Sequence, residues 1–402
     1  MSLNRSDWKK TRAKVKAFVE DKIYPQESVL QGDDRSAANL ALGELIDEAK
    51  LAGLWALGHP VEIGGQGMPF LEYVYINEVI GRSEYAQKVF GTLTHQDSIM
   101  LHEYASEKWK KEYLQPLVSG EVYPSFAMTE PNISSSDPTQ LQTSAVLEDG
   151  NWVINGRKWF TTGADEAAYT TIMCRTETGV DAHKSFSMIV VPTNKRGYNI
   201  IRDTPLLGLN SGHFEVEYDN IRVPEDHLLG GRGEGFLIAQ KRLGPGRIFH
   251  CMRWLGQAQR AFDLMCHRLH ERRAFGGSLA DKQLMQLHVF NSLSEIQACR
   301  QLTLQAARRI DSGDAARIEI GMIKVVGAKM LHNVIDRAVQ VYGAEGLTDD
   351  TPLSRMYRHA REARIYDGPD EVHIQSVARQ LLKRYKGEGP GWDFGERDSE
   401  LM

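Results

Sequence analysis

The chain has 402 residues, 42% of them apolar, and a net charge of −5 from 48 basic and 53 acidic side chains. This length suits two or three domains, and the evenly mixed charges argue against a dedicated nucleic-acid-binding protein. No run of about 18 apolar residues predicts a membrane span, and the N-terminus lacks the apolar stretch of a secretory signal. The four cysteines are far apart and form no CxxC pair, so we expect no disulfide framework, no thiolate metal site and a reducing, cytoplasmic location.

The first third of the chain is predicted to be helical. A first helix ends at Pro25, and further helices are expected at residues 36–54, 70–81, 89–104 and 107–118. Four glycines within residues 58–67 predict a loop. No lysine follows this loop as in a phosphate-binding P-loop, so an ordinary turn is the better interpretation.

From about residue 121 the pattern changes to short β-strands. Asp149-Gly150 predicts a hairpin turn between two of them. The expected strands cover residues 143–147, 151–154, 158–162, 169–174, 186–191, 198–201, 214–218 and 221–223. Short strands with turns at this spacing favour a small β-barrel or sandwich.

Three long helices are predicted in the remainder, at residues 235–272, 281–312 and 315–342, and they favour an antiparallel bundle. The second carries an apolar row: Leu284, Leu287, Phe290, Leu293, Ile296 and Leu302. The predicted fold is mainly α with a β-domain. We expect an N-terminal α-helical domain (1–120), a middle β-barrel domain (121–232), a C-terminal four-helix bundle (233–386) and a loose, charged tail (387–402).

The segment with the densest chemistry is residues 366–373, where three carboxylates and a histidine surround a Gly-Pro break. The break predicts a helix start, with Pro369 at the first helical position and two acidic residues in the first turn. Asp367 lies before the break, behind the apolar pair Ile365-Tyr366. Held against apolar walls, its carboxylate would have a raised pKa, as a general base working near neutrality needs.

Four further segments could contact a phosphate, a flat ring or another ligand, although each also has an ordinary structural explanation, which is the better one for the first two taken alone. Residues 126–137 offer backbone N–H groups and hydroxyls in a turn, and residues 158–163 place aromatic side chains next to paired threonines. Arg272 and Arg273 suit a pyrophosphate, and the glycines of residues 340–346 permit close backbone approach to a ligand. The ordinary explanations are a polar loop, a β-strand, a solvated helix end and a glycine C-cap.

In this order, and together with the Asp367 turn, these segments resemble the acyl-CoA dehydrogenase family over nearly the whole chain. Residues 128–131, 244–247 and 367–373 are most similar to the branch whose eukaryotic members are fused to a kinase-like domain. The resemblance implies an α-domain, a β-barrel domain and a four-helix bundle. It also implies FAD as the cofactor, an acyl-CoA substrate, a homodimer or homotetramer, and an electron-transfer flavoprotein or similar acceptor.

The resemblance also implies the residues that contact each ligand. Thr162 matches a threonine whose hydroxyl approaches flavin N5, and Phe160 stands where a tryptophan is common. The implied cofactor contacts are Phe126, Met128, Thr129, Ser134, Ser135, Phe160, Thr161, Thr162, Arg272, Phe275, Leu279, Gln283, Gln340, Gly343, Pro369, Asp370 and Glu371. Among these, Arg272, Phe275, Gln283, Gln340 and Gly343 match positions that reach FAD across a subunit interface. The implied substrate contacts are Ser135, Ser136, Arg247, Tyr366 and Gly368. The serine loop is one residue longer than usual, which leaves the individual serine roles open.

Asp367 matches the catalytic base of the family, where most members have glutamate. Another branch places its base near Gly246, and glycine has no side chain for that role. The implied reaction is removal of the α-proton of a thioester by Asp367, with hydrogen bonds to the carbonyl oxygen from the Asp367 backbone N–H and a flavin hydroxyl. Transfer of the β-hydrogen as hydride to flavin N5 gives a trans-2-enoyl-CoA.

Several alternatives stay open at this point. Members of the same branch are thought to process 4-hydroxy- or 4-phosphoacyl-CoA. Nitroalkane oxidases share the fold and use an aspartate base, and acyl-CoA oxidases pass electrons to oxygen. A DNA-binding relative would need a basic C-terminal region, which the acidic tail does not provide, and a cofactor-free helical scaffold is a further alternative. His59 and His95 lack metal-ligand spacing, so we predict no metal site, and His373 is expected on a helix surface or interface.

Overall fold

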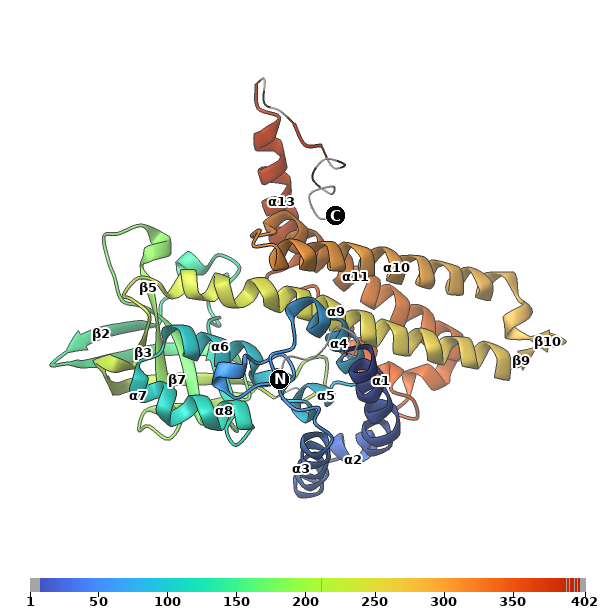
Figure 1. Cartoon of the computed structure of the whole chain (residues 1–402), viewed down its shortest axis with the longest axis horizontal. Coiled ribbons are helices and arrows are strands. Elements are labelled where there is room, and N and C mark those ends of the chain that lie inside the picture. Colours follow the sequence, from blue (N-terminus) through green and yellow to red (C-terminus); the bar gives the residue numbers. More distant parts are fainter. Residues whose placement is uncertain are drawn as a thin grey trace. The chain divides into compact units, whose positions relative to one another are not determined.

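A computed structural model of the chain describes residues 8–210, 212–387, 389, 391–393, 395 and 397 (Figure 1). The chain forms two compact units. One contains the residues up to Trp55, Met68–Phe90 and those from Gly244 on, and the other contains Ala56–Gly67 and Gly91–Leu243. No helix in the described part of the chain combines the length and apolar character that a membrane crossing needs.

The first unit is helical. Its N-terminal elements are α1 (Trp8–Phe18), α2 (Glu27–Leu30), α3 (Arg35–Leu51), α4 (Phe70–Ile80) and α5 (Ala86–Val89). Its C-terminal elements are most of α9 (Gly235–Glu271), α10 (Gln283–Asp311), α11 (Arg317–Tyr342), α12 (Leu353–Glu362) and α13 (Asp370–Arg384). A small hairpin of β9 (Arg273–Ala274) and β10 (Gly277–Ser278) joins α9 to α10 and lies at the far end of both helices in Figure 1. The three long helices therefore lie close to their predicted bounds.

Two glycines allow α4 and α9 to cross with their backbones in contact. A Cβ on Gly256 would lie 1.9 Å from the carbonyl oxygen of Glu78, and one on Gly81 would lie 2.2 Å from that of Arg253. Any larger residue at either position would force the helices apart. This crossing fixes the part of α9 that carries Arg247, His250 and Arg253.

The apolar row predicted on α10 is only partly buried. Ile296 is buried, but Leu284, Leu287, Phe290 and Leu293 are 46–71% exposed. The first four of the six residues in the row are therefore not part of the core of this chain. An exposed apolar stripe of this kind is typical of a protein–protein interface.

The second unit contains three short helices and an eight-stranded sheet. The helices are α6 (His95–Tyr104), α7 (Glu107–Trp109) and α8 (Gln115–Ser119). The strands are β1 (Pro124–Ala127), β2 (Ser144–Glu148), β3 (Asn151–Thr162), β4 (Tyr169–Arg175), β5 (Phe186–Pro192), β6 (Tyr198–Asp203), β7 (His213–Pro224) and β8 (Leu228–Leu229). The strand order is β6-β7-β3-β2-β4-β5-β8, and β1 pairs in parallel with β4. The core between the strands includes the fully buried Trp152 and Tyr218.

Two strands are longer than predicted. Residues 151–154 and 158–162 belong to one strand, β3, and residues 214–218 and 221–223 belong to one strand, β7. The turn-like Asn155-Gly156 does not end β3, because a shift in the pairing with β7 between Ile154 and Gly156 absorbs it. Such an irregularity lets a strand continue through residues that otherwise favour a turn.

The described part of the C-terminal tail makes contacts, which differs from the loose tail expected. The guanidinium of Arg397 lies 2.8 Å from the carboxylate of Glu319 on α11. Trp392 lies between two arginines, with the guanidinium carbons of Arg384 and Arg397 each 4.5 Å from its ring centroid. Buried Arg309 adds a hydrogen bond to the backbone carbonyl of Arg397.

Candidate active site

Asp367 lies on the turn between α12 and α13, as the sequence predicts, and its backbone is strained. Its φ of +55° is in the left-handed region, and Gly368 follows with a φ of +98°. The Asp367 carbonyl accepts hydrogen bonds from the Arg247 guanidinium at 3.1 and 3.2 Å and lies 3.0 Å from Nε2 of His373. A non-glycine residue in this conformation costs about 1 kcal/mol or more, and these contacts hold it there.

The buried ammonium of Lys324 closes the same turn from α11. It donates to the carbonyls of Ala363 at 2.6 Å and Gly368 at 3.1 Å. Burial lowers the pKa of Lys324, and the nearby charge of Asp367 acts in the opposite direction. The lysine therefore fixes both ends of the turn that presents Asp367.

The surroundings of the Asp367 carboxylate correct the expectation of apolar walls. Its Oδ2 lies 3.2 Å from Nε2 of His250, and its charge acts on the nearby cations Arg247 and Lys324. Neighbouring positive charges favour the ionised carboxylate, whereas apolar walls would favour the protonated acid. The Asp367 carboxylate therefore lies among polar and positively charged groups and not between apolar walls.

Sequence reasoning missed His250, Arg253, Trp254 and Lys324. The first three share the face of α9 that carries Arg247, at a spacing of three to seven residues. Trp254 Nε1 donates to the Tyr366 hydroxyl at 2.7 Å, which fixes the residue before Asp367. A stripe of basic and aromatic side chains next to Arg247 was the available signal on α9, while nothing in the local sequence distinguishes Lys324.

A cavity of about 200 Å³ lies next to His250 and Tyr366 within the helical unit. Its wall is unusually rich in charge, and includes Glu27, Arg82, Glu84, Arg253, Arg260, Arg355, His359 and Glu362. Most of these groups are paired: Arg260 with Glu27 at 2.7 Å, Arg355 with Glu84 at 2.5 Å, and His359 with Glu84 and Glu362 at 3.3 and 3.2 Å.

Arg253 is the exception in this wall. It is 9% exposed, and its guanidinium bonds only neutral partners, Asn77 Oδ1 and His250 Nδ1, each at 3.1 Å. Among the described residues, no carboxylate lies within the 4.0 Å of an ion pair with it. A buried cation paired only with neutral groups is costly unless a further anion or polar group joins it.

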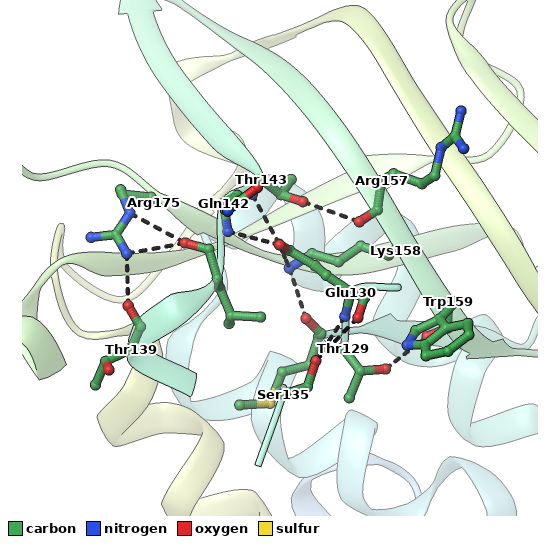
Figure 2. A network of polar contacts seen from close by, with 12 residues as sticks. Thr129, Glu130, Ser135, Thr139, Gln142, Thr143, Arg157, Lys158, Trp159 and Arg175 are labelled. Atoms are coloured by element: carbon green, nitrogen blue, oxygen red, sulfur yellow. Dashed lines mark hydrogen bonds and ion pairs between the residues drawn. The ribbon is translucent and has the colours of Figure 1, made fainter. Parts of the chain in front are cut away.

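The predicted flavin loop belongs to the other unit and is fixed by a buried ion pair (Figure 2). Lys158 on β3 is fully buried and donates to Glu130 Oε1 at 2.9 Å and to the Met128 carbonyl at 2.8 Å. Glu130 also accepts from the backbone N–H groups of Gln142 and Thr143. Burial opposes ionisation of Glu130, but Lys158 and these N–H groups outweigh it and lower its pKa.

Thr129 and Ser135 are engaged within this loop. The Thr129 hydroxyl donates to the Trp159 carbonyl at 2.8 Å, and the Ser135 hydroxyl lies 3.0 Å from the Glu130 backbone nitrogen (Figure 2). Ser134 and Ser136 are exposed, with their hydroxyls 2.9 Å apart. Ser135 is therefore used in hydrogen bonding within the loop, whereas Ser134 and Ser136 are exposed to solvent.

The end of β3 presents an aromatic ring beside a hydroxyl. A shift in strand pairing between Lys158 and Thr161 accompanies a φ of +52° at Phe160, whose ring is 39% exposed. Thr162 is exposed, and its hydroxyl lies 2.8 Å from Nδ1 of His213. Thr161 points the other way and is fully buried, so its side chain belongs to the β core.

Five other predicted cofactor residues lie near one end of the helical unit. Phe275 is 97% exposed, with a φ of +48°, and Arg272, Gln283, Gln340 and Gly343 are also exposed. Arg268 near the end of α9 pairs with Glu345 in the segment after α11 at 2.5 Å, which links the two parts of the chain that carry these residues. Leu279, half-buried, follows the hairpin. The structure therefore gathers these residues at a surface and not within an enclosed pocket of this chain.

The start of α13 differs in detail from the prediction. Pro369 precedes the first helical residue and serves as the N-cap residue. Asp370 is 2% exposed, and its carboxylate accepts from Arg364 Nε at 2.8 Å. Glu371 is exposed. Buried His373 contacts the Asp367 carbonyl, so it lies in the site and not on a helix surface.

These residues fit a flavin nucleotide. An aromatic ring exposed on a strained backbone at Phe160, with the Thr162 hydroxyl beside it, suits a flat heteroaromatic ring with a polar edge. Phe275, 97% exposed with a φ of +48°, also leaves an apolar ring free to contact a bound ligand.

Family models, relatives and solved structures with a similar sequence or fold identify the family of this chain. The N-terminal, middle and C-terminal domain models of acyl-CoA dehydrogenases match residues 6–121, 125–221 and 233–382. The probable acyl-CoA dehydrogenase FadE2 of Mycobacterium tuberculosis is 41% identical over 93% of this chain and 95% of its own length. Human acyl-CoA dehydrogenase family member 11 is 38% identical over 92% of this chain, which spans 50% of that longer protein. A solved structure described as an acyl-CoA dehydrogenase, from Mycobacterium abscessus, superposes with a TM-score of 0.90 at 34% identity, covering 96% of this chain and 100% of its own.

The fold and site thus define a flavin-dependent oxidoreductase. The chain belongs to the acyl-CoA dehydrogenase family, and its cofactor is FAD. The predicted fold class and the similarity to the branch with kinase-fused members are confirmed. The family reaction is FAD-dependent dehydrogenation of acyl-CoA thioesters.

Proposed function

We propose that this chain converts an acyl-CoA to a trans-2-enoyl-CoA, with the carboxylate of Asp367 as the base that removes the α-proton. The observation that supports this role is the strained turn of Asp367, held by Arg247, His373 and Lys324. Tyr366, the residue before it, and His250, which contacts the Asp367 carboxylate, both line the cavity. Strain maintained by several independent contacts is typical of functional sites.

The residues of this chain divide the chemistry between them. The thioester acidifies the α-proton, and Asp367 accepts it. The Asp367 backbone N–H is expected to donate to the thioester carbonyl oxygen, where negative charge develops. When bound, FAD supplies the acceptor for the β-hydrogen as hydride. Phe126, Met128, Thr129, Phe160 and Thr162 are the residues we expect at its ring.

A second substrate class is favoured by the charged wall of the cavity. Arg253, the arginine of this wall that is not ion-paired, would contact a polar or anionic substituent on the acyl chain, whereas a plain alkyl chain would leave it with neutral partners only. A 4-hydroxy- or 4-phosphoacyl-CoA has such a substituent. We therefore include both in the substrate test, in addition to unsubstituted acyl-CoAs.

The expected partners follow from surface features. The exposed Phe275 and the exposed row on α10 support a homodimer or homotetramer in which a second copy covers them. Reoxidation would use an electron-transfer flavoprotein or a similar acceptor.

The test is anaerobic addition of each acyl-CoA to the FAD-loaded protein while the oxidised-flavin absorbance is followed. We expect one substrate class to bleach the flavin, and Asp367→Asn to bind FAD normally but to bleach at least about 1,000-fold more slowly. Comparison of 4-hydroxy, 4-phospho and unsubstituted chains of equal length identifies the substituent.

Two results would contradict the proposal. Full activity in Asp367→Asn would remove Asp367 from its role. A failure of every thioester to bleach a flavin that dithionite reduces normally would favour a nitroalkane substrate instead. Rapid oxygen consumption without an added acceptor would indicate an oxidase.

A further inference from the structure

His250 and Arg253 form a hydrogen-bonded relay that ends on the Asp367 carboxylate. His250 Nε2 lies 3.2 Å from Asp367 Oδ2, and the Arg253 guanidinium lies 3.1 Å from His250 Nδ1. We propose that His250, locked in one tautomer by Arg253, is a positioning residue that orients the Asp367 carboxylate. This inference rests on the proposed role of Asp367 as the base.

The tautomer of His250 follows from its neighbour. An arginine guanidinium has only N–H donors and stays protonated in proteins. Nδ1 of His250 must therefore accept from Arg253, and the ring proton of the neutral imidazole then lies on Nε2. That N–H points at Asp367 Oδ2 and donates to the carboxylate.

Arg253 is itself held in place by α4. Its guanidinium donates to Asn77 Oδ1 at 3.1 Å, and Asn77 Nδ2 donates to the Tyr73 carbonyl at 2.9 Å. Asn77 is fully buried. Because α4 and α9 touch at Gly81 and Gly256, this relay is anchored at the rigid crossing of two helices.

These hydrogen bonds matter because the side chain of the proposed base is short. Aspartate is one methylene shorter than the glutamate that most of the family carries, and a misplacement of about 1 Å can cost roughly 100-fold in rate. A hydrogen bond to Oδ2 limits rotation of the carboxylate. It also stabilises the ionised form that accepts the proton.

The relay further decides where the α-proton goes. The substrate C–H bond breaks and an O–H bond forms on Asp367. His250 does not take this proton, because Nε2 already has one and Nδ1 is occupied by Arg253. The cations that face this pair are Arg247 and Arg253 on α9 and Lys324 on α11, and His373 on α13 contacts the same turn; a second proton on His250 would add to this positive charge.

Two amide variants separate positioning from packing. In His250→Gln the amide nitrogen reaches the place of Nε2, whereas in His250→Asn, one methylene shorter, it does not. We expect His250→Gln to keep activity within about threefold, and His250→Asn to lose about 10- to 100-fold in kcat with little change in KM. His267→Leu, a change of an exposed histidine on the same helix, is the control for loss of an imidazole and should behave as wild type.

A second measurement isolates proton removal. An acyl-CoA with sulfur in place of the β-carbon can lose its α-proton but has no β-hydrogen to transfer. Deuterium incorporation at its α-carbon in D2O, followed by mass spectrometry, should fall in His250→Asn by the same factor as kcat. The acidic limb of the kcat/KM profile should move up by about one pH unit, because the lost hydrogen bond favoured the ionised base.

The outcomes are distinguishable. Equal exchange rates in the Gln and Asn variants, or an Asn variant with the wild-type pH profile, would overturn the relay while leaving Asp367 as the base. Exchange that persists in Asp367→Asn would overturn the proposed function itself.

Discussion

At the scale of single residues, the length of the Asp367 side chain is the first feature to test. In Asp367→Glu an added methylene displaces the carboxylate from the position in which its Oδ2 lies 3.2 Å from Nε2 of His250. Because the turn is fixed by Arg247, His373 and Lys324, it cannot retreat to compensate. We expect kcat to fall about 100-fold with FAD affinity unchanged, as measured by steady-state kinetics and flavin titration. Unchanged kcat would show that the base tolerates displacement.

His359 provides a pH-dependent contribution to stability. Burial opposes its charge, but hydrogen bonds to Glu362 and Glu84 outweigh burial and raise the pKa of His359 to about 9. A raised pKa contributes stability that is complete below the unfolded value of about 6.5 and is lost as pH rises through about 9. The free energy of unfolding of wild type should therefore exceed that of His359→Gln by at most about 3 kcal/mol near pH 6, and this difference should shrink by pH 10. Urea unfolding of both proteins across this range checks it; a constant difference would contradict it.

At the scale of elements, the buried pair Lys158–Glu130 determines whether the flavin loop is ordered. Removing one partner leaves the other charge buried, so Glu130→Gln should destabilise the chain by about 3–5 kcal/mol and weaken FAD binding. The matched control is Glu217→Gln, because Glu217 pairs with Arg157 at 2.9 Å on the same sheet but its side chain is 37% exposed; its cost should be below about 1 kcal/mol. Denaturant unfolding measures both, and equal costs would show that burial of the pair is unimportant.

The crossing of α4 and α9 makes a second prediction at this scale. A methyl group at Gly256 meets the Glu78 carbonyl at 1.9 Å, so Gly256→Ala should destabilise the chain by about 1–3 kcal/mol. Gly43 lies within α3, where an added Cβ meets nothing within 4 Å. Gly43→Ala should therefore stabilise by about 0.5–1 kcal/mol. We expect the melting temperature to fall in Gly256→Ala and to rise in Gly43→Ala. A lower melting temperature in Gly43→Ala would contradict the geometry.

At the scale of the whole molecule, the exposed row on α10 predicts self-association. Leu287 and Phe290 lie on one face, 50% and 65% exposed. Leu287→Glu together with Phe290→Glu should shift the protein toward monomer in light scattering, because each burial of a large apolar side chain contributes about 1.5–3 kcal/mol. The control is Val146→Glu, which is also exposed but lies on the β-sheet unit. A wild-type monomer would contradict this prediction.

The sequence by itself determined the order of a helical segment, a β-domain and long helices, because hydrophobic period and turn residues are local properties. It also determined Asp367 on a turn before a helix, since Gly-Pro and the acidic first turn mark that boundary. The tertiary structure alone decided what surrounds the carboxylate. His250, Arg253 and Lys324 lie 43 to 117 positions away in the chain, and only the packing of α9 and α11 brings their charges to the turn. The same packing replaced the expected apolar walls by cations. It also left four of the six residues of the α10 row at the surface, because a helical period does not specify what covers it.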